Sequence, residues 1–278
     1  MPLHLLARAA LAAALVVWSL LATAVEPPVY SIAIVPQSSA TQMYAGWQPL
    51  LKRVGDDAGI RLDIKLHGTI PTFETAFLRG EPDFIFGNPY HAVMARRAQG
   101  YVPLVRDTET LVGVLVVPTN SPARTLKDLD GQKVAFPAPN AFGASLYMRA
   151  LIDAAAVRIE PNYVKTHGNV YRRVALGEFA AGGGINQTFN DQTPEIRAQL
   201  RILYQTSGAA PHPVMVHPRV PQLLRERIVG AFLNLAKDNV GRALLKEVLI
   251  PKPVAADYMR DYAPLEQLHL DKYLVLEK

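Results

Sequence analysis

The stretch DFIFGNPY, residues 83–90, contains in one place the pattern that decides the fold. Residues 83–86 form a short, mostly apolar run before a glycine, which predicts a buried strand. Asn88 and Pro89 then supply an N-cap and a first helical residue, so a helix is predicted from there to about Gln99. A strand, a short polar loop and a helix start in direct succession are typical of a layered α/β protein.

The same succession recurs on both sides of this stretch. The glycine-rich run at residues 182–185 lacks the spacing of a dinucleotide-binding loop, so it is interpreted as a turn. The repeated pattern otherwise predicts an α/β fold along the whole chain. Strands are predicted over residues 30–36, 62–66, 111–117, 134–137, 163–166 and 202–205. Helices are predicted to end near Asp57 and Leu78, to cover residues 142–155 and 169–176, and to dominate the chain after Pro221.

Two polar stretches divide this pattern. Residues 118–122 and 207–213 both follow predicted strands and are polar or rich in proline. Such stretches are typical of places where a chain crosses between domains. We therefore predict two lobes, with lobe 1 formed by residues 25–118 and 212–278 and lobe 2 by residues 119–211.

The beginning of the chain predicts export. An apolar run covers residues 9–21, and Ala22-Thr23-Ala24 follows as the small-x-small pattern that signal peptidase recognises. The alternative is a membrane anchor, but the run is shorter than the roughly 20 residues that a spanning helix needs. We expect a cleaved signal peptide over residues 1–24, a mature chain that begins at or near Val25, and a periplasmic location. Because the sequence has no cysteine, we expect no lipid anchor.

The charge balance argues against nucleic acid as a partner. The chain has 29 Lys and Arg against 24 Asp and Glu, a net charge of +5. Loss of Arg8 with the signal peptide leaves 28 against 24, or +4. These charges are spread without a basic stripe or interleaved aromatic residues, which nucleic-acid binding would require. A mild positive balance is compatible with an anionic ligand but is also ordinary for an exported protein.

The sequence contains no recognisable catalytic motif. The absence of cysteine excludes thiolate catalysis and cysteine-based zinc sites. A Gly-x-Ser-x-Gly elbow, a phosphate-binding loop and a His-Glu-x-x-His motif are all missing. We therefore expect a protein that is not an enzyme and that has no cofactor and no metal, with an enzyme on the same fold as a remote alternative.

Several predicted helix starts could bind an anion. The first N–H groups of a helix have no intrahelical acceptor and carry a partial positive charge, and in α/β sheets such starts gather at the carboxyl ends of the strands. Ordinary alternatives stay open: a helix cap for Ser38 and Thr69, a core residue for Tyr90, and a structural histidine for His167. His91, His212 and His217 are interpreted as structural histidines. The candidate ligand-binding residues are Ser38, Thr69, Asn88, Tyr90, Asn140, Ala141, Phe142, Gly143, Ala144, Ser145 and His167.

Five segments carry a resemblance to a known family. They are TFETAFLRGEPDF (72–84), GNPY (87–90), TLKDLDGQKVAF (125–136), NAFGAS (140–145), and HGNV (167–170) running into ALGE (175–178). In this order they resemble the phosphate/phosphite/phosphonate-binding family of ABC-transporter periplasmic substrate-binding proteins, over essentially the whole mature chain. The Leu-x-Asp-Leu-x-Gly-x-x-Val part alone is common to many type II binding proteins and indicates only the fold.

The resemblance implies a two-lobed periplasmic-binding-protein type II (Venus flytrap) fold with oxyanion contacts from Tyr90, the loop 140–145 and His167. Two departures leave the ligand open. Ala180 stands where aminophosphonate binders of the family have Asp, so an aminophosphonate is expected to bind no better than phosphate, phosphite or methylphosphonate unless Glu178 faces the cleft. The loop is also poorer in hydroxyl groups than is usual in the family.

These observations predict a monomer that captures a small oxyanion (phosphate, phosphite or a phosphonate) for an ABC permease. The alternative is that the same lobes present the ligand to a membrane sensor kinase or cyclase. The two functions use the same lobe surfaces and differ only in the partner, so the sequence leaves both open.

Overall fold

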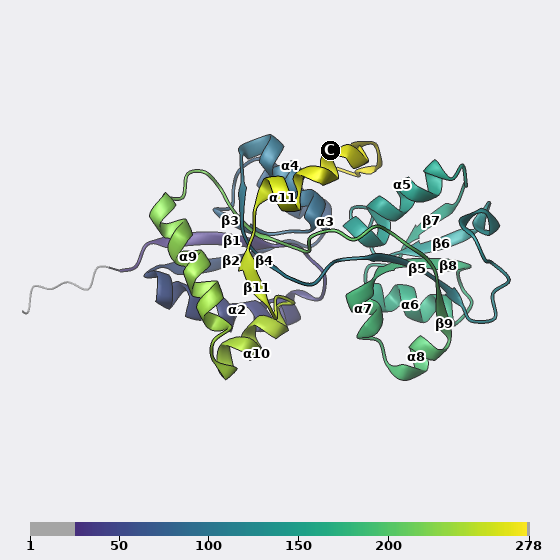
Figure 1. Ribbon diagram of the computed structural model, residues 1–278, viewed down its shortest axis with the longest axis horizontal. Coiled ribbons are helices and arrows are strands. Elements are labelled where there is room, and N and C mark those ends of the chain that lie inside the picture. The colour runs from purple at the N-terminus through teal and green to yellow at the C-terminus, as the bar shows by residue number, and fades with distance from the viewer. Residues whose placement is uncertain (1–25, 277–278) are drawn as a thin grey trace, which may run out of the picture.

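The computed structural model describes residues 26–276, which form two lobes side by side, each built on its own sheet (Figure 1). The α/β, two-lobed architecture predicted from the sequence is confirmed. The predicted signal peptide, residues 1–24, lies outside the described residues. Within residues 26–276, no helix combines the length and apolarity needed to span a membrane.

Lobe 1 contains a six-stranded sheet in the order β11-β4-β10-β3-β1-β2. β1 is parallel to β2 and β3, whereas β10 is antiparallel to β3 and β4, and β11 is antiparallel to β4. Helix α2 packs against α9 and α10, and α3 packs against α4. The strands are β1 (Val29–Ile34), β2 (Arg61–Leu66), β3 (Phe84–Phe86), β4 (Val102–Asp107), β10 (Val214–Val216) and β11 (Pro253–Ala255). The helices are α2 (Ala40–Ala58), α3 (Ile70–Leu78), α4 (Pro89–Gln99), α9 (Gln222–Leu235), α10 (Asn239–Glu247), α11 (Tyr258–Asp261), η3 (Ala263–Leu268) and η4 (Leu270–Tyr273).

Lobe 2 contains a five-stranded sheet in the order β7-β6-β8-β5-β9. β6 is parallel to β7 and β8, and β5 is antiparallel to β8 and β9. The strands are β5 (Gly113–Pro118), β6 (Lys133–Phe136), β7 (Glu160–Tyr163), β8 (Ala181–Ile185) and β9 (Leu200–Gln205). The helices are η1 (Leu126–Leu129), η2 (Phe142–Leu146), α5 (Tyr147–Ala154), α6 (His167–Ala175), α7 (Asn186–Asn190) and α8 (Pro194–Ala198).

The chain leaves lobe 1 earlier than the sequence predicted. β4 ends in the first sheet at Asp107 and β5 begins in the second sheet at Gly113, so residues 108–112 form the first crossing. The predicted crossing at 118–122 instead lies within lobe 2, directly after β5. Its prolines end that strand and do not mark a boundary between the lobes. The return from β9 to β10 covers residues 206–213, the region of the second predicted crossing.

The glycine-rich run 182–185 is a strand and not the predicted turn. It forms most of β8, which lies fully buried between β6 and β5. A Cβ atom at Gly183 would collide with the carbonyl oxygen of Ala144, and one at Gly184 would collide with the ring of Tyr171. The glycines therefore serve close packing, and they allow the turn that contains Ala144 to lie directly on the sheet.

Other differences from the predicted elements concern three strands that were not predicted and two segments whose bounds are shifted. β4, β10 and β11 were not predicted, and two of them have only three residues each. The strand predicted at 163–166 lies at β7, because Thr166 is the N-cap of α6. The helix predicted from residue 142 begins as the single π-helical turn η2 before it continues as α5.

Several helix starts are fixed by side-chain caps, as the sequence indicated. Asn88 accepts hydrogen bonds from the backbone N–H groups of Tyr90 and His91, both at 3.0 Å, and so begins α4. Ser39 and Thr69 form capping boxes at the starts of α2 and α3. Such caps satisfy N–H groups that the helix itself leaves unpaired.

Candidate ligand-binding cleft

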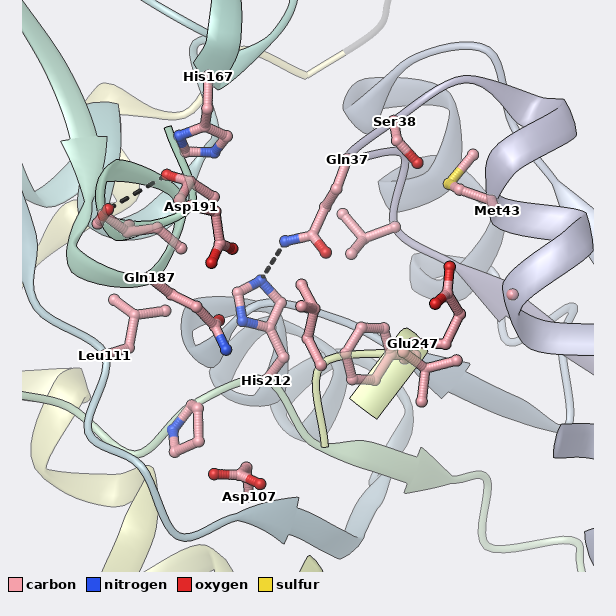
Figure 2. A pocket seen from close by; sticks show the side chains of 18 of the residues that line it. Gln37, Ser38, Met43, Asp107, Leu111, His167, Gln187, Asp191, His212 and Glu247 are labelled. Carbon is pink, nitrogen blue, oxygen red and sulfur yellow. Dashed lines mark hydrogen bonds between the residues drawn. The ribbon is translucent and has the colours of Figure 1, made fainter. Parts of the chain in front are cut away.

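A cavity of about 410 Å³, which we call the chamber, lies between the two lobes (Figure 2). Lobe 1 contributes Gln37 and Ser38 from the loop after β1, and lobe 2 contributes His167 and Gln187 from the starts of α6 and α7. Both crossings also line it, because Thr110, Leu111, Pro211 and His212 are among its wall residues. A cavity with walls from both lobes and both crossings is the expected position for a ligand in a two-lobed α/β protein.

A smaller cavity of about 40 Å³, which we call the notch, adjoins the chamber. The two cavities share wall residues from both lobes, among them Gln37, His167 and His212. The notch is additionally lined by Asn88 and by residues 141–144 at the start of η2. The two cavities together therefore form a small recess at a helix start that opens into a wider space.

The helix start at the notch presents backbone donors. Ser145 and Leu146 donate their N–H groups to the carbonyl oxygen of Ala141, and Ala141 donates its own to Ala138 at 3.3 Å. Phe142, Gly143 and Ala144 lie in the first turn, where N–H groups have no intrahelical acceptor. Because η2 continues into α5, these groups stand at the positive end of a helix. The notch can therefore receive an anionic oxygen atom without any charged side chain.

Two histidines that line both cavities are neutral at neutral pH. Burial lowers the pKa of His167 to about 4. Burial, and then the neighbouring histidines, lowers the pKa of His212 to about 3. Gln37 donates its amide to Nε2 of His212 at 2.9 Å, whereas Nδ1 of His167 is buried without a hydrogen-bond partner among the described residues. The orphaned nitrogen of His167 is the clearest polar group in the cleft that a ligand could satisfy.

Carboxylates line the chamber and not the notch. Asp107 accepts N–H groups from Glu109 at 2.7 Å and Lys252 at 2.6 Å, so its role is structural. Asp191 and Glu247 make no hydrogen bond or ion pair through their carboxylates within residues 26–276. Figure 2 shows Asp191 between His167 and His212, and Glu247 on the opposite side of the chamber. Both residues are exposed, so water solvates their carboxylates, and in the chamber they are acceptors available to a ligand part that carries N–H or O–H groups.

The structure brings together part of the predicted set of ligand-binding residues. Asn88, Ala141, Phe142, Gly143 and Ala144 line the notch, Ser38 lines the chamber, and His167 lines both. His212 was interpreted as structural, yet it also belongs to both walls. Its position in the predicted crossing 207–213 is the signal that could have indicated a cleft residue.

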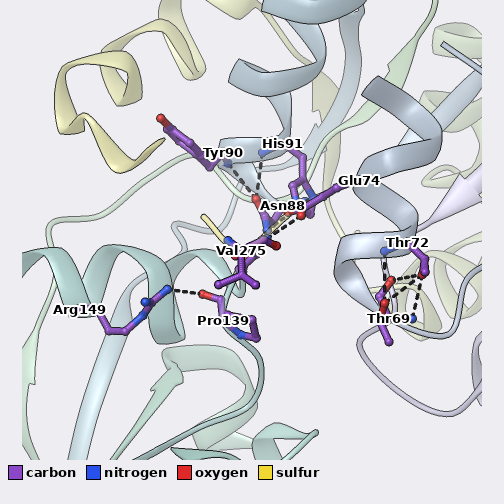
Figure 3. Close-up of polar contacts among 10 residues, drawn as sticks. Thr69, Thr72, Glu74, Asn88, Tyr90, His91, Pro139, Arg149 and Val275 are labelled. Atoms are coloured by element: carbon purple, nitrogen blue, oxygen red, sulfur yellow. Dashed lines mark hydrogen bonds and ion pairs between the residues drawn. The ribbon is translucent and has the colours of Figure 1, made fainter. Parts of the chain in front are cut away.

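The other predicted residues line neither cavity. Thr69 is exposed and shares hydrogen bonds with Thr72, and Ser145 accepts from Nε of Arg149 at 3.2 Å. The ring of Tyr90 points toward the C-terminal segment (Figure 3), and burial, followed by Asp271, raises its pKa to about 12. The side chain of Asn140 bonds to Glu74 and Val275.

The two positions behind the predicted ligand preference also lie outside both cavities. Glu178 is ion-paired with Arg173 at 2.6 Å on the surface. Ala180 packs against the core of lobe 2 and is not among the residues that line the chamber or the notch. The expectation about aminophosphonates therefore loses its basis, because neither residue lines the space where a ligand would lie. Among residues 26–276 there is also no group of three or more metal-ligating side chains that could hold a metal ion.

A cleft between two α/β lobes, with a helix start and neutral donors at its base, defines a two-lobed solute-binding protein. The chain belongs to the family of periplasmic substrate-binding proteins of phosphonate ABC transporters, whose family model matches residues 32–262. The family predicted from the sequence is thereby confirmed. No curated protein matches the chain by sequence.

Solved structures show the same fold at low sequence identity. A binding-protein component of an ABC phosphonate transporter from Pseudomonas aeruginosa is 14% identical with a TM-score of 0.75, covering 88% of this chain and 86% of that chain. PhnD1 from Prochlorococcus marinus, in complex with methylphosphonate, is 15% identical with a TM-score of 0.76, covering 87% of this chain and 97% of that chain. A protein from Xanthomonas citri bound to a chloride ion is 18% identical with a TM-score of 0.77, covering 88% of this chain and 99% of that chain.

Proposed function

We propose that this periplasmic substrate-binding protein holds the phosphonyl group of a phosphonate in the notch. The observation that carries the proposal is the buried Nδ1 of His167, which has no partner among the described residues and adjoins a helix start. An unsatisfied buried polar atom costs about 1–3 kcal/mol, which a ligand oxygen would relieve. The methylphosphonate held by PhnD1 of Prochlorococcus marinus supports this class of ligand.

Apart from the exposed Lys165, the donors in the notch are neutral, and this has consequences for affinity. The N–H groups of Phe142, Gly143 and Ala144 and the imidazole of His167 would each meet one charged oxygen atom. A hydrogen bond to a charged group contributes about 1.5–3 kcal/mol, more than a neutral pair. These neutral donors can therefore bind the oxygens by themselves. Lys165, which is exposed, is the one cation among the described residues of the notch wall.

The substituent of the phosphonate lies in the chamber under this proposal. The chamber is about ten times larger than the notch, at about 410 Å³ against about 40 Å³. A methyl group would leave most of it to water. The free carboxylates of Asp191 and Glu247 favour a substituent with donor groups, such as the ammonium group of 2-aminoethylphosphonate. This preference is the reverse of the one expected from Ala180.

Calorimetric titration with four ligands tests the proposal. We expect 2-aminoethylphosphonate to bind more tightly than methylphosphonate, phosphite and phosphate. Asp191→Asn should weaken the binding of 2-aminoethylphosphonate relative to methylphosphonate by about ten-fold or more, since a charge-assisted hydrogen bond is lost. Glu178→Gln is the matched control, because that carboxylate lies outside the cavities. Equal binding of methylphosphonate would contradict the role of the chamber, and binding of none of the four would contradict the proposed function.

We further propose that the chain delivers the bound phosphonate to an ABC permease. It would do so as a monomer and without catalysing a reaction. The family match supports the transporter. The alternative, a membrane sensor kinase or cyclase, would use the same lobe surfaces and differ only in the partner. The signal peptide predicted over residues 1–24 supports the periplasmic location. Mass spectrometry of periplasmic protein should find a mature chain that begins at or near Val25, whereas an intact Met1 in the membrane fraction would contradict the cleavage.

A further inference from the structure

A fully buried carboxylate lies where the two lobes meet. Glu74 of α3 has no exposed surface. Its Oε1 atom is 2.9 Å from Nε2 of His91 in α4, and its Oε2 atom accepts a hydrogen bond of 2.6 Å from Nδ2 of Asn140 in lobe 2 (Figure 3). The backbone N–H of Asn88 donates to Nδ1 of His91, which leaves the imidazole proton on the side of Glu74. The carboxylate is thus held by groups from both lobes.

The amide of Asn140 is fully used by the protein itself. Its Nδ2 atom donates both hydrogens, one to Glu74 and one to the carbonyl oxygen of Val275 at 2.9 Å. Its Oδ1 atom accepts the backbone N–H of Val275, also at 2.9 Å. The backbone carbonyl of Asn140 accepts from Nδ2 of Asn88 at 3.0 Å. With both N–H groups engaged, this side chain has no donor left for a ligand.

Val275 belongs to a C-terminal segment that is bonded to both lobes (Figure 1). On lobe 1, Arg97 of α4 pairs with Asp271 at 3.4 Å. On lobe 2, Lys272 pairs with Asp153 of α5 at 3.0 Å, and Arg149 of the same helix donates to the carbonyl oxygen of Tyr273 at 2.9 Å. The segment therefore lies across the junction next to the loop that lines the notch.

We propose that Asn140 is a positioning residue that couples the notch to the relative position of the lobes. It immediately precedes the notch residues 141–144, and it ties them to Glu74 of lobe 1 and to the C-terminal segment. The start of η2 is then held beside lobe 1 only while these bonds are intact. This role rests on the proposed function, because it matters for binding only if the notch holds the ligand.

The consequence is a shift in population rather than a lost ligand contact. If the binding-competent arrangement is populated less, the apparent dissociation constant rises by the same factor. Asn140→Ala should therefore raise the dissociation constant for methylphosphonate and 2-aminoethylphosphonate by the same factor, at least about ten-fold. A residue that touched the substituent would instead change the two ligands unequally.

Pulsed EPR distances between spin labels give the decisive readout. The chain has no cysteine, so labels at Leu223→Cys in α9 and Glu195→Cys in α8 report only the distance between the lobes. Without ligand, Asn140→Ala should shift the distribution toward longer distances, and saturating ligand should restore the shorter ones. Asn162→Ala is the matched control, since within residues 26–276 its amide bonds only to the nearby Glu160 carbonyl.

Two further variants keep the test decisive if Asn140→Ala does not fold. Glu74→Leu removes both acceptor atoms, and a chain that ends at Leu274 removes the partner Val275. Both should change the distances in the same direction as Asn140→Ala. An unchanged distance distribution, with or without weaker binding, would overturn the proposal. If the parent chain binds no phosphonate, the proposed function fails, while the distances still decide the role of Asn140.

Discussion

At the scale of single residues, the site depends on neutral groups at a helix start. The sequence allowed the notch residues Asn88, 141–144 and His167 to be selected, because each occupies a strand-to-helix loop. The direction of a side chain could not be predicted in the same way. Tyr90 follows a cap in sequence, yet its hydroxyl faces the C-terminal segment, which joins the site only through the tertiary fold.

Replacing His167 should weaken binding without weakening the fold. His167→Ala removes one donor to a charged oxygen, so we expect a loss of about ten- to a hundred-fold in affinity by calorimetry. The melting temperature without ligand should stay nearly unchanged, because the lost nitrogen has no protein partner within the described chain. Tyr90→Phe is the control and should bind normally. A larger loss for Tyr90→Phe than for His167→Ala would contradict this description of the site.

The two partly buried histidines of the cleft, His167 and His212, also predict how stability depends on pH. Their folded pKa values of about 4 and about 3 lie below the ordinary value of 6.5. At a pH between the folded and the ordinary pKa values, the two histidines bind more protons in the unfolded chain than in the folded chain. The free energy of unfolding should therefore fall as the pH falls from about 6.5 to about 4. Melting temperatures across this range should decline less steeply for a His167→Gln, His212→Gln double variant. An equally steep decline in that variant would refute the assignment.

At the scale of elements, the long helices and most strands could be predicted, the three-residue β3 among them, whereas β4, β10 and β11 could not. Asn88-Pro89 begins α4 as expected, because a cap and a proline act locally. β10 and β11, with three residues each, exist only because neighbouring strands offer hydrogen bonds. The run 182–185 was misinterpreted for a related reason. Its glycines are required by the close packing of η2 and α6 against β8, which only the tertiary fold shows.

Gly183→Ala tests that packing directly. The new methyl group would collide with the Ala144 carbonyl and the Phe136 ring, so we expect a loss of about 1–3 kcal/mol in the free energy of unfolding. Ligand affinity should fall as well, because Ala144 lines the notch. Gly230→Ala in α9 is the control, with open space for its Cβ and a gain of about 0.5–1 kcal/mol. Urea unfolding measures the free energy of unfolding of both variants. An unchanged free energy of unfolding for Gly183→Ala would contradict the close approach of η2 to β8.

At the scale of the whole molecule, the sequence indicated two lobes but located one crossing too late. Proline-rich residues 118–122 end β5, while the true first crossing, residues 108–112, has no proline to mark it. The cleft arises from this topology: both crossings contribute to the chamber wall, and the helix starts of both lobes face each other there. No local pattern could predict that Asp191 and Glu247, 56 positions apart in sequence, would line the same chamber.

A crystal structure of the chain with 2-aminoethylphosphonate would show directly whether the notch holds the phosphonyl group. The phosphonyl oxygens should lie in the notch, within hydrogen-bond distance of the N–H groups of residues 142–144 and of His167. The ammonium group should extend into the chamber toward Asp191 or Glu247. A phosphonyl group held elsewhere in the cleft, with Nδ1 of His167 still unpartnered, would contradict this proposal.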